Sequence, residues 1–187
     1  MYYKLSSDQE NFRNYFLPEE YNFEYSQSFD GRSHVDSYKP ITFVMTKKSE
    51  KKYPIADIMC GFVPVCSERA KNVISDICKE GEVEFLPCNL EGSNDQYYIF
   101  NILGTEDCVD YEKSKFTRFQ SSGRIMSFDH IEFNRNVDRN FFRISDLKNN
   151  FYFVSEEAKN KLEQAGLLGV RISDKLFKKW WFILLSV

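Results

Sequence analysis

The stretch VCSERAKNVISDICKEGEVEFLP (65–87) carries the clearest fold signal in this chain of 187 residues. Its apolar residues recur with the 3.6-residue period of an amphipathic helix. These residues are Ala70, Val73, Ile74, Ile77 and Cys78. Ser67 stands at the N-cap position and Gly81 follows the last turn as a stop signal. Apolar runs at 62–65 and 83–87 flank this segment, so the stretch predicts a strand, a Ser-capped helix and a second strand.

A second copy of the same pattern occurs later in the chain. The segment FVSEEAKNKL (153–162) aligns with VCSERAKNVI (65–74), and the two share Ser, Glu, Ala, Lys and Asn. Gly166 ends the second helix, and apolar runs at 151–154 and 168–172 flank it. We therefore expect the strand–helix–strand unit twice. Coincidence is the alternative, because Ser-Glu-x-Ala-Lys is common helix-start chemistry.

The remaining segments add strands rather than further helices. The runs 83–87 and 97–103 predict an antiparallel hairpin with a long loop. ITFVMT (41–46) is rich in β-formers, a strand is expected near 2–5, and 180–187 predicts a buried terminal strand. The expected fold class is therefore α+β, with largely antiparallel sheets and two Ser-capped amphipathic helices.

We expect one domain over 1–187, since a chain of 22.2 kDa can bury a sizeable core without a disulfide or metal. Within it, the aromatic-rich N-terminal segment 1–60 is expected to be mostly irregular. A first strand–helix–strand–hairpin unit is expected over 62–103, and a second unit with the C-terminal strand over 141–187.

Composition narrows the class of partner. The net charge is −3, whereas generic nucleic-acid binders are usually basic. The longest apolar run, 180–185, is far shorter than the roughly 20 residues that span a membrane. The chain start shows no export leader, and five cysteines, an odd number without Cys-x-x-Cys, favour buried reduced thiols. These features predict a cytoplasmic protein that binds neither nucleic acid nor membrane.

The sequence has few features that indicate catalysis. The chain contains no nucleophile elbow, phosphate loop, dinucleotide fingerprint or His-Glu-x-x-His helix, so we expect no cofactor and no metal. The densest acidic cluster comprises Glu106, Asp107, Asp110 and Glu112. These carboxylates could bind a cation or act as acid and base, with His130 as a further candidate. The simpler alternative, which we favour over the chemical one, is a solvated acidic loop after the 97–103 strand. A third alternative is that the cluster presents negative charge to a basic partner.

Aromatic residues suggest two further binding hypotheses. Rings and cations alternate at 115–119 and at 139–143, as in stacking platforms for single-stranded nucleic acid. Strands with one buried face give the same pattern, and the net acidity favours strands. Trp180 and Trp181 are candidate interface anchors, with core packing as the alternative.

The order of several segments resembles a known family. A Ser-Glu-Arg-Ala helix start at 67–70 is followed by GEVEFLPC (81–88), YYIFNIL (97–103) and EDCVDYEKS (106–114). FFRISDL, FVSEEAKNKLEQAGLLGVRI and an N-terminal MYYKL complete the set. This order resembles the immunity proteins of bacterial polymorphic-toxin systems, specifically family eleven, well over 62–172 and loosely over the first 60 residues.

The resemblance implies a non-enzymatic cytoplasmic protein that is encoded beside a toxin and binds that toxin. It supplies no catalytic residues and no fixed contact residues. We therefore expect stoichiometric occlusion of a cognate toxin, with Glu106, Asp107, Asp110, Glu112, Trp180 and Trp181 as candidate contacts. The alternatives are a small hydrolase or transferase that uses the carboxylate cluster, and a single-stranded nucleic-acid-binding module.

Overall fold

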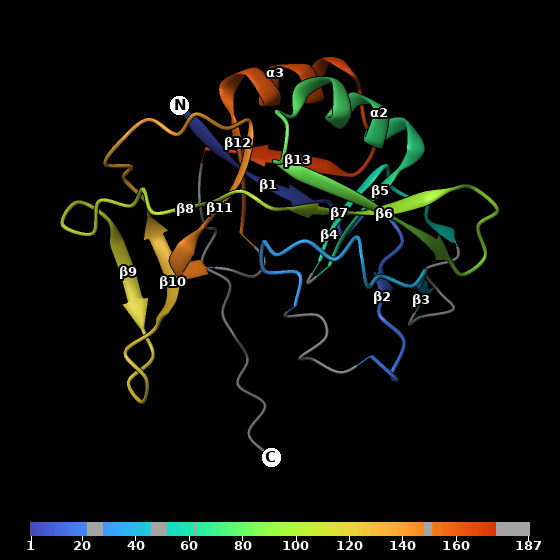
Figure 1. The fold of residues 1–187 in the computed structure, drawn as a ribbon, viewed down its shortest axis with the longest axis horizontal. Helices are drawn as coiled ribbons and strands as arrows, with labels where there is room; N and C mark the ends of the chain where they lie inside the picture. Colours follow the sequence, from blue (N-terminus) through green and yellow to red (C-terminus); the bar gives the residue numbers. More distant parts are fainter. Residues whose placement is uncertain (22–27, 46–51, 62, 148–150, 175–187) are drawn as a thin grey trace.

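The computed structural model describes residues 1–21, 28–45, 52–61, 63–147 and 151–174. Within these residues the chain forms a six-stranded sheet, a five-stranded sheet and a separate two-stranded ribbon, with two α-helices on one side (Figure 1). Most strand pairs are antiparallel. The α+β class and the antiparallel character expected from the sequence are therefore confirmed. The predicted terminal strand at 180–187 lies outside the described residues.

The six-stranded sheet has the order β2-β3-β6-β7-β5-β4. Its strands are β2 (Tyr15–Phe16), β3 (Thr42–Met45), β4 (Ile58–Cys60), β5 (Pro64–Ser67), β6 (Val83–Leu90) and β7 (Tyr97–Ile102). The central pair β6–β7 is the antiparallel hairpin that the sequence predicts, with Phe85 opposite Phe100.

The five-stranded sheet has the order β13-β1-β12-β11-β8. Its strands are β1 (Tyr2–Ser7), β8 (Thr105–Glu106), β11 (Phe141–Ile144), β12 (Tyr152–Ser155) and β13 (Val170–Ser173). A 3₁₀ turn, η2 (Ser145–Leu147), follows β11. The N-terminal strand expected near 2–5 thus extends to Ser7 and lies inside a sheet, between two strands from the end of the described chain.

The two helices begin in the same way. Helix α2 (Glu68–Ile77) starts after Ser67, whose hydroxyl accepts from the backbone N–H of Ala70 at 3.2 Å. Helix α3 (Glu156–Gln164) starts after Ser155, whose hydroxyl accepts from the N–H of Ala158 at 3.1 Å. These hydroxyls satisfy N–H groups that have no partner within the helix.

The strands around the two helices pair in equivalent ways. Strands β5 and β6, which flank α2 in sequence, both pair antiparallel with β7 between them. Strands β12 and β13, which flank α3, both pair antiparallel with β1 between them. Each helix therefore crosses over an antiparallel strand that comes from elsewhere in the chain.

Helix α2 packs on the six-stranded sheet, helix α3 packs on the five-stranded sheet, and the two helices contact each other (Figure 1). Their buried residues meet rings from both sheets in one core, which includes Ile74, Leu162, Phe100, Phe141 and Tyr152. A second core lies under the opposite face of the six-stranded sheet, and a third joins the five-stranded sheet to the ribbon. All four residues of strand β11 are buried, and Arg143 is the one charged residue among them.

None of the helices in the described ranges is long and apolar enough to cross a membrane.

Candidate functional site

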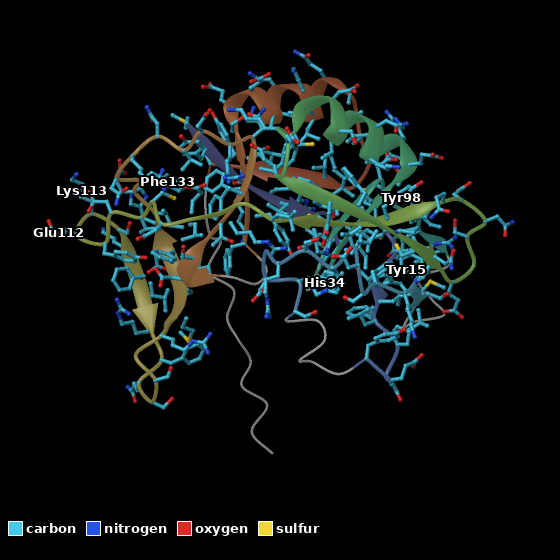
Figure 2. All side chains as sticks on the ribbon, in the orientation of Figure 1. Tyr15, His34, Tyr98, Glu112, Lys113 and Phe133 are labelled. Atoms are coloured by element: carbon cyan, nitrogen blue, oxygen red, sulfur yellow. The ribbon has the colours of Figure 1, made fainter. Side chains whose placement is uncertain are left out.

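The acidic segment 106–112 lies at one end of the molecule, where it leaves strand β8. Figure 2 labels Glu112 and Lys113 there, with Phe133 close by, while Tyr15 and Tyr98 lie on the opposite side. The structure brings the four predicted carboxylates into one region, but gives them different environments.

Glu106 is bound in two ion pairs. Its carboxylate accepts from Arg135 Nη2 at 2.6 Å and from Arg139 Nε at 2.7 Å, and its side chain is only 14% exposed. Burial opposes ionisation of Glu106, but the hydrogen bonds from Arg139 and Arg135 outweigh burial and lower its pKa. This carboxylate fastens the segment 135–139 to β8 and is not available as a proton acceptor.

Asp110 also serves the fold. Its carboxylate accepts from the backbone N–H groups of Glu112 at 3.1 Å and Lys113 at 3.2 Å, and it pairs with Lys113 Nζ at 2.8 Å. The hydrogen bond from the Lys113 side chain is the main cause that lowers the Asp110 pKa. Asp110 therefore closes the turn that carries Glu112 and Lys113.

Asp107 and Glu112 are exposed. Within the described part of the chain, neither side chain has an ion-pair partner. Of the four acidic residues among the predicted contacts, these two are thus available to another molecule.

Among the described residues, the side chains proposed for catalysis are not arranged around one common centre. His130 Nε2 lies 3.3 Å from Glu132 Oε2, with both side chains about half exposed. No group of three His, Cys, Asp or Glu side chains among the described residues could hold a metal ion. Glu106 and Asp110 are directed to different basic partners rather than to one shared reaction centre.

A protruding hairpin lies beside the acidic segment (Figure 1). Strands β9 (Lys115–Arg118) and β10 (Ile125–His130) form it, and they pair only with each other in the described structure. The Tyr111 ring contacts Phe116 at 5.9 Å between centroids, and the N–H of Asp110 donates to the Glu132 carbonyl at 2.8 Å. The acidic turn and the base of this hairpin therefore form one unit around the third core.

The hairpin was not predicted, although the ring–cation alternation at 115–119 falls on it. The second aromatic–basic stretch, 139–143, is a different case. Phe141, Phe142 and Arg143 are fully buried in β11, so that stretch cannot be a stacking platform for nucleic acid. A strand forms there, as the strand interpretation expected, but all of its residues are buried instead of one face. At 115–118 the strand interpretation is confirmed, because β9 has only Phe116 partly buried between exposed residues.

Arg143 is a structural cation. Its guanidinium donates to the carbonyl of Ile102 at 2.7 Å and to Asn101 Oδ1 at 3.2 Å, and it lies 4.8 Å from the Tyr152 ring centroid. Burial lowers its pKa. These contacts join β11 to β7 and thereby link the two large sheets.

A cavity of about 370 Å³ lies on the other side of the molecule. Its wall is largely apolar and includes Phe12, Tyr15, Phe43, Ile58 and Met59. Its polar groups are engaged: Arg13 Nε donates to the Tyr53 carbonyl at 2.6 Å, and Asp8 pairs with Arg171 at 2.8 Å. Among the described residues that line it, we find no set of convergent free polar groups that would mark a ligand site.

The five cysteines are free thiols in the structure. Cys66, Cys88 and Cys108 are buried, and Cys60 and Cys78 are partly buried. Burial raises the pKa of Cys60 and of Cys88 to about 12 and that of Cys108 to about 11. Such thiols are poor nucleophiles. Trp180 and Trp181, the remaining predicted contact residues, lie outside the described residues.

The sequence model of the immunity protein family Imm11 matches residues 5–175. No curated protein matches the chain.

Proposed function

Because this chain belongs to the Imm11 immunity protein family, we propose that it binds one cognate toxin and neutralises it by stoichiometric occlusion. It acts in the cytoplasm of the producing cell, on a toxin encoded beside it. The family match over 5–175 is the observation that carries this proposal.

The form of the surface supports occlusion rather than turnover. A protein inhibitor needs a rigid surface that buries about 800 Å² per partner and carries a few anchoring side chains. It needs no catalytic group. At the acidic end, Glu106 and Asp110 are fixed by basic partners, and the neighbouring Asp107 and Glu112 are exposed. Fixed carboxylates hold the exposed ones in place before binding, which lowers the entropic cost of association.

Asp107 and Glu112 are the charged contacts in this proposal. If the toxin acts on nucleic acid, its active surface is basic, and exposed carboxylates speed encounter with such a surface. Glu106 and Asp110 do not contact the toxin in this proposal; their ion pairs hold the segment that carries Asp107 and Glu112 in position. Trp180 and Trp181 remain proposed anchors.

The test is a titration of toxin against this protein. We expect complete protection at one molecule of this protein per toxin molecule, and proportionally less protection below that ratio. Asp107→Lys with Glu112→Lys should slow association at low salt. The matched control, Asp76→Lys with Glu80→Lys, makes the same charge change at exposed positions on or just after α2 and should leave association unchanged.

Two outcomes would count against the proposal. Protection at clearly substoichiometric ratios would indicate an enzyme, and the Asp107→Asn, Asp110→Asn variant would then lose protection while still binding. Failure of the intact protein to bind the adjacent toxin would reject occlusion itself.

A further inference from the structure

The β9–β10 hairpin projects from the body of the molecule (Figure 1). Its base is held by aromatic contacts: the Phe116 ring meets Phe128 at 5.6 Å and Tyr111 at 5.9 Å, and Phe128 is fully buried. Its end is closed by backbone hydrogen bonds of 2.9 Å between Phe119 and Arg124 and between Gly123 and Phe119. Gly123 has φ +67°, which a tight turn tolerates best with glycine. The hairpin is therefore an ordered projection.

The two faces of the hairpin differ. Alternate residues of a strand point to opposite faces, so Phe116 and Arg118 share the face whose base packs on the core. Lys115 and Thr117 share the other face, which we call the outer face of the hairpin, and both are exposed. Phe119, the first residue after β9, is exposed as well.

Two large apolar side chains on the hairpin have little cover. Phe119 is 48% exposed and Met126 is 46% exposed. Met126 sits at a register shift between Ile125 and Ser127, where the extra residue of a bulge redirects the side chain. They are two of the six large exposed hydrophobic residues in the described part of the chain. Half-exposed apolar side chains on a projecting element are available as anchors for a partner protein.

The hairpin is also basic in an acidic protein. Residues 115–130 contain Lys115, Arg118 and Arg124 against one acidic residue, Asp129, while the whole chain has a net charge of −3. The three basic side chains are exposed, and none has an acidic partner within the described residues. Arg118 donates only to the Gly123 carbonyl, at 2.8 Å, and lies over the Phe116 ring. Their charge is available to a partner.

The β10 edge is not suited to adding a strand. Register shifts interrupt β10 on both sides of Phe128, and such bulges blunt an edge. The hairpin is therefore expected to bind through its side chains.

We propose that the β9–β10 hairpin is the main toxin-binding element, with Phe119 and Met126 entering an apolar depression on the toxin whose rim carries carboxylates that pair with Arg118 and Arg124. This inference rests on the proposed function and adds the partner's surface chemistry to it. The exposed Asp107 and Glu112 beside the hairpin then meet basic groups at the margin of the same interface.

The test measures binding of an inactivated form of the toxin encoded beside this chain. Phe119→Ala should raise the Kd about 30-fold, as expected for an aromatic anchor, and Met126→Ala should raise it less. Arg118→Glu with Arg124→Glu should lower the association rate about tenfold at low salt. Phe119 and Met126 are about half exposed, so the two alanine variants should leave the thermal midpoint unchanged. Arg118→Glu removes the hydrogen bond to the Gly123 carbonyl, so the thermal midpoint of the double arginine variant is measured before its association rate is compared.

Matched controls separate the hairpin from the rest of the surface. Phe16 on β2 is also 48% exposed, and Phe16→Ala should leave the Kd unchanged. Lys39→Glu with Lys52→Glu repeats the charge change at exposed positions outside the hairpin and should leave the association rate unchanged.

The outcomes distinguish this inference from the proposed function. If the intact protein binds the toxin and the hairpin variants bind equally well, the hairpin is not the contact, whereas the proposed function stands. Loss of binding in Phe16→Ala but not in Phe119→Ala would place the interface at the cavity side instead. Binding of a single-stranded 12-nucleotide DNA that Phe119→Ala abolishes, without toxin binding, would overturn both.

Discussion

The backbone N–H of Asn140 donates to the carboxylate of Glu82 at 2.9 Å, and both residues are buried. The Asn140 side chain donates to the Ile77 carbonyl at the end of α2 at 2.8 Å and accepts from Ser155, the N-cap of α3, at 2.5 Å. Glu82 also accepts from the N–H groups of Lys79 at 3.1 Å and Phe141 at 3.2 Å. One polar cluster thus connects the end of the first helix to the start of the second.

Glu82→Ala should destabilise the protein by about 3 kcal/mol, because it leaves three N–H groups without their acceptor. Glu82→Gln should cost less, since one side-chain oxygen remains. Urea unfolding at pH 7 measures both. Glu80→Ala, two residues earlier and exposed, is the control and should cost less than about 0.5 kcal/mol. Equal stabilities for Glu82→Ala and Glu80→Ala would contradict the assigned role.

The sequence predicted the parts of this fold that depend on local signals. Helix α2 was recognisable from its apolar period and from Ser67, and the β6–β7 hairpin from two adjacent strand-like runs. The position of β1 between β12 and β13 was not predictable, because pairing between residues about 150 apart has no local signature. The polar cluster around Glu82 was not predicted for the same reason, since Glu82 and Asn140 are far apart in the sequence.

The candidate site was only partly predictable. The sequence identified the acidic cluster but could not tell the bound Glu106 from the exposed Glu112, since the partners of Glu106 lie about 30 residues away. The β9–β10 hairpin was missed although Ser122 and Gly123 are typical turn residues. Its two bulges break the strict alternation by which strands are recognised.

Glu106→Gln should destabilise the protein in a pH-dependent manner. The pKa of Glu106 in the folded protein is lower than its ordinary value of 4.5. Its stabilisation is therefore complete above about pH 4.5 and is lost as the pH falls through the folded-state pKa. We expect a cost of about 1 kcal/mol at pH 7, from loss of charge-assisted hydrogen bonds, and this cost should shrink as the pH falls below 4.5.

Urea unfolding of wild type and Glu106→Gln at pH 7, 5 and 3.5 provides the measurement. Glu112→Gln is the control, because Glu112 is exposed and has no ion pair among the described residues. A cost that stays constant from pH 7 to pH 3.5 would show that the ion pairs with Arg135 and Arg139 do not stabilise the fold.

Asp57→Ala should uncouple the start of α2 from the end of α3. Asp57 accepts from Ser67 Oγ at 2.6 Å, from the Leu168 N–H at 2.8 Å and from Arg69 at 3.2 Å. Arg69 in turn donates to the Ala165 carbonyl at 2.7 Å, where a cation also complements the helix dipole. We expect a loss of about 2 kcal/mol for Asp57→Ala and about 1 kcal/mol for Arg69→Ala.

A double-mutant cycle gives the decisive measurement for this cluster. The double variant should cost less than the sum of the two single variants, since they share one network. Arg32→Ala serves as the control: within the described residues Arg32 forms an ion pair with Asp30 alone, and its side chain is 74% exposed, so its loss should have little effect. Strict additivity of Asp57→Ala and Arg69→Ala would show that the two side chains act independently.

The native thiols should react slowly with a disulfide reagent at pH 8, because burial raises the pKa of Cys60 and Cys88 to about 12 and that of Cys66 well above its ordinary value. Cys78, at the end of α2, is the least enclosed and should react first, so Cys78→Ser should remove the fastest phase. All five thiols should react at once in urea. Because the unfolded thiols ionise near pH 9 and the native ones do not, the free energy of unfolding should also fall as the pH rises above 9. Rapid reaction of several native thiols at pH 8 would show that the cores around β5 and β6 open far more readily than their burial indicates.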